Sequence, residues 1–214
     1  MDFDLDIEDD FNSYLGIGIE EFPDGTRHMT QKGLIKKILK TAQMENCNPN
    51  WNPCTQITLG SDPDGEPFNN QRFSYASIVG MLLYLSNNTR PDITFAVSQV
   101  ARFTHAPKAS HASAVKIILR YLARTPNHGI IVKPNGTYNL QCWVDADFSG
   151  LYGKEPEQKP ASAKSQYGYI VSFAGVPLVW ESQLISEICL STLHAEYVGL
   201  SSAVREVIPL QKLT

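Results

Sequence analysis

Several features that would define a protein class are missing from this sequence. No apolar run reaches the roughly 18 residues that a membrane-spanning helix needs, so we expect no membrane partner. The N-terminus has no basic segment ahead of an apolar one and so lacks the pattern of a secretory signal. The four cysteines form no C-x-x-C pair, which favours free thiols in a reducing compartment over a zinc site. We therefore expect an intracellular protein.

Other absences concern catalysis and order. No G-x-S-x-G segment is present, and Ser191 is better explained as a helix cap than as a hydrolase nucleophile. Charged residues make up 19% and apolar residues 43%, proportions that exclude general disorder. The 22 acidic residues outnumber the 18 basic ones, but six acidic residues lie within the first ten positions. The remainder is slightly basic, which is compatible with an anionic partner.

The first two thirds of the sequence predict mainly helices. Alternation of apolar and small residues predicts a strand at 14–20, a PDGT turn, and a second strand up to Met29. Apolar residues spaced three and four positions apart then predict four helices, at residues 30–42, 73–85, 93–103 and 108–124. The Asn-, Pro- and Gly-rich segment 45–72 predicts a long surface connection.

The last third predicts strands followed by one helix. A PNG turn predicts a hairpin between residues 130–132 and 138–146, and Gly175 predicts another hairpin within 167–182. A final helix is expected at 191–207, with Ser191 as its N-cap. We expect its buried stripe to consist of Leu193, Tyr197, Leu200 and Val204.

Two predicted helices carry basic residues at four-residue spacing. Such stripes are typical either of a solvated helix face or of a surface that contacts nucleic-acid phosphates, and the pattern alone leaves both interpretations open. The residues are Lys32, Lys36 and Lys40 on the first helix, and Lys116, Arg120 and Arg124 on the fourth.

The segment WVDADFSG at 143–150 ends a predicted strand with two acidic residues. Asp145 and Asp147 would share one face of the strand, roughly 7 Å apart. If the last helix crosses back over the sheet, Glu196 approaches them, and the carboxylates suit a Mg²⁺ site for phosphodiester hydrolysis. The alternative is structural, with Asp145 ending a strand, Asp147 starting a turn and Glu196 solvated.

Seven segments, taken in order, resemble the C-terminal part of a Ty1/copia-type retrotransposon polyprotein. TRPDITFAV, and DAD paired with the later AEY, are specific in combination. The segments are YLGIGIE (14–20), CNPNWNPC (47–54), YASIVGMLLYLSNNTRPDITFAVSQVARF (75–103), KIILRYLARTP (116–126), WVDADFSG (143–150), YGYIVSFAGVPLVWES (167–182) and STLHAEYVGLSSAVRE (191–206).

The resemblance implies three regions in an α+β arrangement. Residues 1–29 would be a remnant of the reverse-transcriptase palm, and residues 30–137 a helical thumb and connection region. Residues 138–214 would be a truncated ribonuclease H-like domain, with an incomplete mixed sheet and one packed helix. The implied partner is an RNA–DNA hybrid or a primer–template duplex, contacted through Lys36, Lys40, Arg120 and Arg124.

The resemblance also assigns roles at the acidic site. Asp145 takes the place of the family's first-strand aspartate, and Glu196 that of its helix glutamate, in a Mg²⁺ site that cleaves the RNA of a hybrid. Asp147 belongs to the motif without a ligand role. Ser191 and Thr192 lie where the helix start would meet the sugar edge of the RNA strand.

The sequence departs from the family pattern in two respects. It has neither the aspartate-bearing palm segments of the polymerase nor the later ribonuclease H aspartate, so we expect the isolated chain to be inactive. The alternative functions are a nucleic-acid-binding remnant and a structural remnant of a decayed element. The remainder of the polyprotein is a further expected partner, in the nucleus or in a cytoplasmic virus-like particle.

Overall fold

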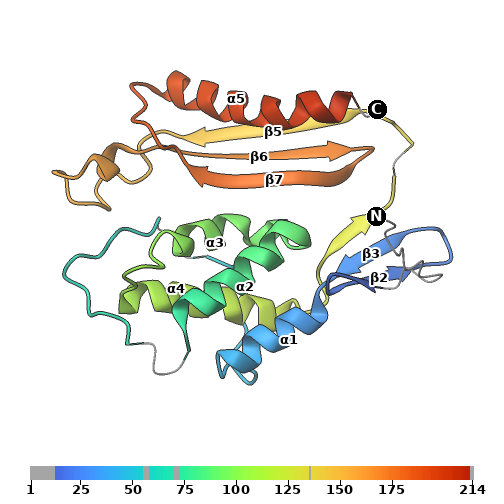
Figure 1. Ribbon diagram of the computed structural model, residues 1–214, viewed down its shortest axis with the longest axis horizontal. Coiled ribbons are helices and arrows are strands. Elements are labelled where there is room, and N and C mark those ends of the chain that lie inside the picture. The colour runs from blue at the N-terminus through green and yellow to red at the C-terminus, as the bar shows by residue number, and fades with distance from the viewer. Residues whose placement is uncertain (1–12, 55–57, 70–72, 135, 213–214) are drawn as a thin grey trace, which may run out of the picture.

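The computed structural model describes residues 13–54, 58–69, 73–134 and 136–212, so the acidic stretch at residues 1–10 lies outside it. The described chain is a mixed α+β protein with two antiparallel sheets (Figure 1). Its elements are β1 (Ser13–Tyr14), β2 (Ile17–Glu21), β3 (Arg27–Thr30), α1 (Lys32–Thr41), α2 (Tyr75–Asn88), α3 (Thr94–Ala101), α4 (Ala109–Arg124), β4 (Ile130–Val132), β5 (Leu140–Asp147), β6 (Gln166–Phe173), β7 (Val176–Leu184) and α5 (Thr192–Gln211).

The first sheet joins the beginning of the chain to its middle. Its strand order is β1-β2-β3-β4, and the PDGT turn connects β2 to β3 as the sequence predicts. The predicted hairpin between 130–132 and 138–146 is wrong, because β4 pairs with β3 and β5 pairs with β6 in the other sheet. The PNG turn favours pairing of β4 with β5, but β5 instead forms eight residue pairs with β6.

Helices α1 to α4 pack around one apolar core. The buried faces of α1 and α4 are those that the 3.6-residue period predicts, and Ile35 and Leu119 at their centres are fully buried. Helix α2 departs from the expectation of complete burial, because Leu83 and Tyr84 are exposed. Among the described residues, no helix combines the length and apolarity needed to cross a bilayer.

A buried arginine fastens these helices together. Arg90 is 1% exposed, and its guanidinium donates to Asp92 through Nε at 2.9 Å and Nη2 at 2.8 Å. It also donates to the Thr125 carbonyl at 2.9 Å and to Thr125 Oγ1 at 2.8 Å, at the end of α4. Tyr121 donates its hydroxyl to Asp92 at 2.8 Å. The turn between α2 and α3 is thereby tied to the end of α4.

Helices α1 to α4 are called the helical unit below. The second sheet, β5-β6-β7, lies between α5 and this helical unit (Figure 1). The α5 face that meets the sheet is formed by Ala195, Gly199 and Ala203, each separated by four residues. The predicted buried stripe is therefore on the wrong face. The predicted stripe is exposed instead, because α5 approaches Tyr167 and Val144 so closely that only small residues fit between the helix and the sheet. The exposed stripe is Leu193, Tyr197, Leu200, Val204 and Ile208.

The opposite face of the sheet meets the helical unit through side-chain hydrogen bonds. Trp180 on β7 donates Nε1 to the Ser86 carbonyl at 2.8 Å. Gln99 on α3 donates Nε2 to Gln166 Oε1 at 2.8 Å, and both glutamines are buried. These contacts fix α2, through Ser86, and α3, through Gln99, against the sheet face onto which Asp145 projects.

Replacing Arg90 with methionine should lower the free energy of unfolding by about 3 kcal/mol, because Asp92 and Thr125 lose buried partners. Urea unfolding followed by circular dichroism measures this loss. Arg27→Met, which breaks an exposed ion pair with Glu21, should cost less than about 1 kcal/mol. Equal losses from the two substitutions would show that burial adds nothing to the Arg90 network.

Candidate functional site

The strand that carries Asp145 presents its residues alternately to two environments. Val144 faces α5, where its Cγ1 lies 3.2 Å from the position that a Cβ on Gly199 would occupy. Asp145 therefore projects to the other face, where it borders a groove of about 430 Å³. The groove is also lined by Thr94, Phe95, Trp143 and Trp180.

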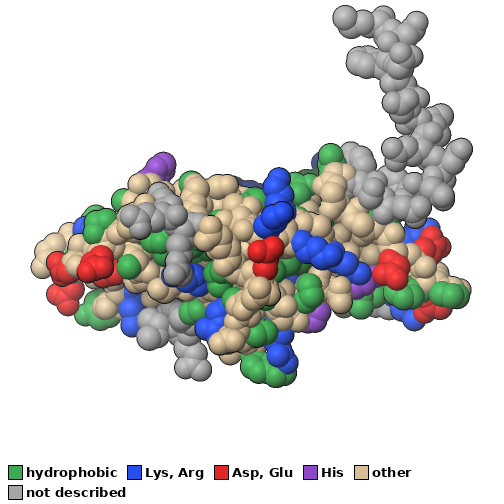
Figure 2. Space-filling model, turned by 90° about the horizontal axis from the view of Figure 1, so that it is seen from below, with side chains coloured by type: hydrophobic (Ala, Val, Ile, Leu, Met, Phe, Trp, Pro, Cys, Tyr) green, Lys and Arg blue, Asp and Glu red, His purple; other side chains and the backbone are tan. Residues whose placement is uncertain are grey.

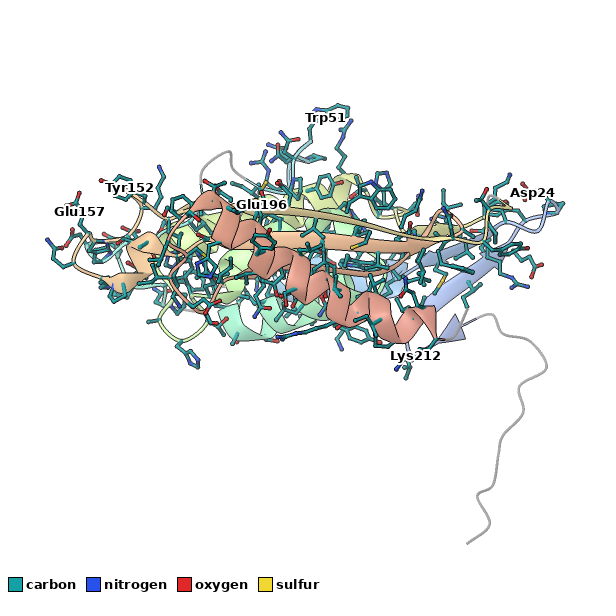
Figure 3. All side chains as sticks on the ribbon, turned by 90° about the horizontal axis from the view of Figure 1, so that it is seen from above. Asp24, Trp51, Tyr152, Glu157, Glu196 and Lys212 are labelled. Carbon is teal, nitrogen blue, oxygen red and sulfur yellow. The ribbon has the colours of Figure 1, made fainter. Side chains whose placement is uncertain are left out.

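Glu196 lies in the second turn of α5 and is half-buried. Figure 3 shows it close to the start of the helix, and Figure 1 shows this start over the end of β5. Asp145 and Glu196 thus lie at the same end of the two layers but on different sides of β5. Because β5 is the edge of its sheet, an ion that touched both carboxylates would lie beside that free edge.

The described residues do not form a complete metal site. None of their His, Cys, Asp and Glu side chains gather into a group of three or more suited to hold an ion. The oxygen donors of Asp145 and Glu196 are of the type that Mg²⁺ prefers, but two carboxylates are too few to fix it. The pair stays a prediction, and no catalytic step follows from this chain alone.

Asp147 has a structural role in the turn after β5. A Cβ on Gly150 would lie 2.1 Å from Asp147 Oδ2, so the carboxylate packs directly over the glycine backbone. Ser149 between them has a positive φ of 53°. The end of the DADFSG segment is thus a tight turn in which the Asp147 carboxylate packs on Gly150, in agreement with the interpretation of Asp147 as a turn residue.

Ser191 caps α5, as its sequence position predicts. Its Oγ accepts a hydrogen bond from the His194 amide at 3.1 Å, and His194 Nδ1 accepts one from the Leu190 amide at 3.3 Å. Thr192 is exposed beside this cap. A contact of Ser191 with an RNA sugar stays a prediction, and its hydroxyl already has this structural partner.

A polar cluster separates the groove from α5. Tyr167 donates its one hydroxyl proton to an acceptor pair, Glu181 Oε2 at 3.2 Å and Gln183 Oε1 at 3.1 Å, which share it. Burial, together with the charge of Glu181, raises the pKa of Tyr167 above its ordinary value, so the hydroxyl keeps its proton at neutral pH. Glu181 is therefore held by a neutral donor on the α5 side of the sheet.

The lysines of α1 are free to meet an anionic partner. Lys32, Lys36 and Lys40 are exposed. The ion pairs found in the described part of the chain join Arg27 to Glu21, Arg90 to Asp92 and Lys133 to Asp24, so they include none of these lysines. Figure 2 shows Lys and Arg side chains over the middle of the face formed by the helical unit.

The arginines of α4 contact the loop that follows α1. Arg120 donates Nε to the Asn48 carbonyl at 2.5 Å, and Arg124 lies over the indole of Trp51 with its Cζ 3.0 Å from the ring centroid. Lys116, one turn earlier, is half-buried. Sequence reasoning did not single out Trp51, because a lone aromatic residue in a polar loop belongs to no periodic pattern.

Known proteins similar to this chain include transposon polyproteins. The chain is 33% identical over 205 residues to the retrovirus-related Pol polyprotein from transposon RE1 of Arabidopsis thaliana, covering 96% of the chain and 13% of that protein. It is 32% identical over 189 residues to the corresponding polyprotein from transposon TNT 1-94 of Nicotiana tabacum, covering 86% of the chain and 14% of that protein.

A shorter relative matches over most of its own length. The chain is 34% identical over 134 residues to the secreted RxLR effector protein 161 of Plasmopara viticola, covering 63% of the chain and 89% of that protein. No family model and no solved structure matches the chain.

Replacing Gly199 with leucine should lower the free energy of unfolding by about 2 kcal/mol, because a large side chain forces α5 away from Val144 and Tyr167. Thermal and urea unfolding measure the change. Gly80→Leu is the matched control, since nothing lies within 4 Å of a Cβ at that position of α2. It should be neutral or stabilising. Unchanged stability in Gly199→Leu would contradict the close packing of α5.

Proposed function

The chain belongs to the retrovirus-related Pol polyproteins of copia-type transposons, and we propose that it joins the end of their reverse transcriptase to the start of their ribonuclease H domain. The observation that carries this proposal is the unit formed by β5, β6, β7 and α5. Three antiparallel strands are followed by a helix that packs across the first two. Asp145 lies near the end of the first strand and Glu196 in the second turn of the helix, where the resemblance puts the two ligands.

The proposed cofactor is Mg²⁺, held in part by Asp145 and Glu196. When bound, it would supply the charge stabilisation that hydrolysis of the RNA strand of a hybrid requires. The chain spans only 13% and 14% of the two plant polyproteins, so ribonuclease activity of the whole is proposed here from the family, with further ligands from outside this chain. In the isolated chain, both carboxylates remain without a third donor among the described residues.

Two surfaces of this unit fit the remainder of the polyprotein as a partner. The outer edge of β5 has no neighbouring strand among the described residues. Above it, the apolar stripe of α5 includes Leu193 at 63% and Tyr197 at 61% exposure. An unpaired strand edge and an exposed apolar helix face favour a strand and an apolar element as the covering structure.

A second function, nucleic-acid binding, rests on a separate observation. The exposed lysines of α1 have no acidic partner among the described ion pairs, and the helical unit that carries them has its own apolar core. We propose that this face contacts the phosphates of a primer–template duplex or an RNA–DNA hybrid.

The isolated chain should not cleave a labelled RNA–DNA hybrid in the presence of Mg²⁺, because its donor set is incomplete. Denaturing gel electrophoresis of the RNA strand is the measurement. The matched variant is Asp145→Asn, which should behave as the unchanged chain does. Cleavage that Asp145→Asn abolishes would mean that the chain holds a working site by itself.

Lys36→Ala with Lys40→Ala should weaken binding of a short duplex and reduce its salt dependence. Each lost phosphate contact lowers the slope of log affinity against log salt concentration by about 0.9. Fluorescence anisotropy across a salt series measures both quantities. Lys154→Ala with Lys159→Ala removes the same charge from another exposed segment and should change neither. Duplex binding that both pairs affect equally would assign the effect to net charge alone.

A further inference from the structure

Trp51 is held in solvent by a rigid loop. Its side chain is 74% exposed, although tryptophan is among the residues that gain most from burial. Two hydrogen bonds join the loop to Arg120 of α4. The Asn50 amide donates to the Arg120 carbonyl at 3.1 Å, and Arg120 Nε donates to the Asn48 carbonyl at 2.5 Å. The indole is thus presented at a fixed position.

Arg124 covers one part of the indole and leaves the rest open. Its Cζ lies 3.0 Å from the ring centroid, which is a stacked arrangement of guanidinium on aromatic ring. Because the indole stays 74% exposed in that arrangement, its other face is accessible. Figure 3 shows Trp51 projecting from the body of the molecule.

The surroundings of Trp51 are cationic and polar. Arg120 lies one turn before Arg124 on α4, and Lys116 lies one turn before Arg120. The sequence neighbours of Trp51 are Asn50 and Asn52, and Asn50 Nδ2 donates to the Asn52 backbone carbonyl at 3.0 Å. A nucleic acid suits a flat ring beside positive charge, because its bases stack on the ring and its phosphates meet the charge.

We propose that Trp51 is a stacking platform for an unpaired base of a single-stranded nucleic acid, with Arg124 and Arg120 next to the flanking phosphates. This inference rests on the proposed nucleic-acid binding and adds the part of the ligand that is recognised. Bases inside a duplex hide their faces from a surface ring, so the platform takes a single strand or an unpaired overhang.

The test compares Trp51→Ala with the unchanged chain on labelled oligothymidylate and on a blunt duplex of equal length, using fluorescence anisotropy. Loss of base stacking should weaken single-strand binding about tenfold, within the range known for such platforms, and blunt-duplex binding less than about twofold. The salt slope should stay unchanged, since no charge is removed. Trp51→Phe keeps an aromatic ring and should retain most of the single-strand affinity.

The matched control is Tyr152→Ala, an aromatic residue 71% exposed on another loop, which should leave both affinities unchanged. Three outcomes would overturn the inference. Unchanged single-strand affinity in Trp51→Ala, with duplex binding intact, rejects the platform but not the proposed function. Equal losses on both probes assign Trp51 to holding its loop. Failure of the unchanged chain to bind either probe rejects the proposed nucleic-acid binding together with the platform.

Discussion

The buried guanidinium of Arg90 is the contact on which the arrangement of the helices depends. Four hydrogen bonds from one side chain join the turn before α3 to the end of α4. Burial raises the pKa of Asp92, but the hydrogen bonds and charge of Arg90, together with the Tyr121 hydroxyl, lower it further, and the net pKa lies below its usual value. The ion pair is therefore intact at neutral pH. The TRPD segment, part of the specific markers of the resemblance, thus serves the fold through this ion pair.

The helices that Arg90 holds together also contact one face of the second sheet. The bond from Trp180 to Ser86 holds α2, and the bond from Gln99 to Gln166 holds α3, against the face onto which Asp145 projects. Helix α5 occupies the other face, with Glu196 in its second turn. An ion shared by the two carboxylates would lie beside the edge of β5, so in the proposed function the further ligands would come from what lies against that edge.

The spacing of apolar residues predicts the buried face of a helix correctly where the helix has one apolar stripe. It predicts the wrong face where the helix has two. Helices α1 and α4 bury the stripe that the sequence predicts, and Ser191 caps α5 as expected. Helix α5 carries two stripes, and the small residues around Gly199 are buried while the larger apolar ones are exposed. Choosing the more hydrophobic stripe gives the wrong buried face of α5. How closely the helix approaches the sheet depends on the sheet surface, which the sequence of the helix does not reveal. Likewise, β4 pairs with β3, a strand far away in the sequence, and a local turn motif carries no information about such a distant partner.

The two proposed activities depend on different parts of the structure. The helical unit buries its own core, and its lysines, its arginines and Trp51 are positioned by α1, α4 and the loop that follows α1. None of these contacts involves the free edge of β5 or the exposed stripe of α5. The proposed nucleic-acid binding should therefore persist in a chain whose metal site is incomplete, while the proposed hydrolysis would need a structure that supplies both a neighbour for β5 and another carboxylate. The same physical separation would let a segment of a polyprotein keep the proposed nucleic-acid surface without the proposed metal site.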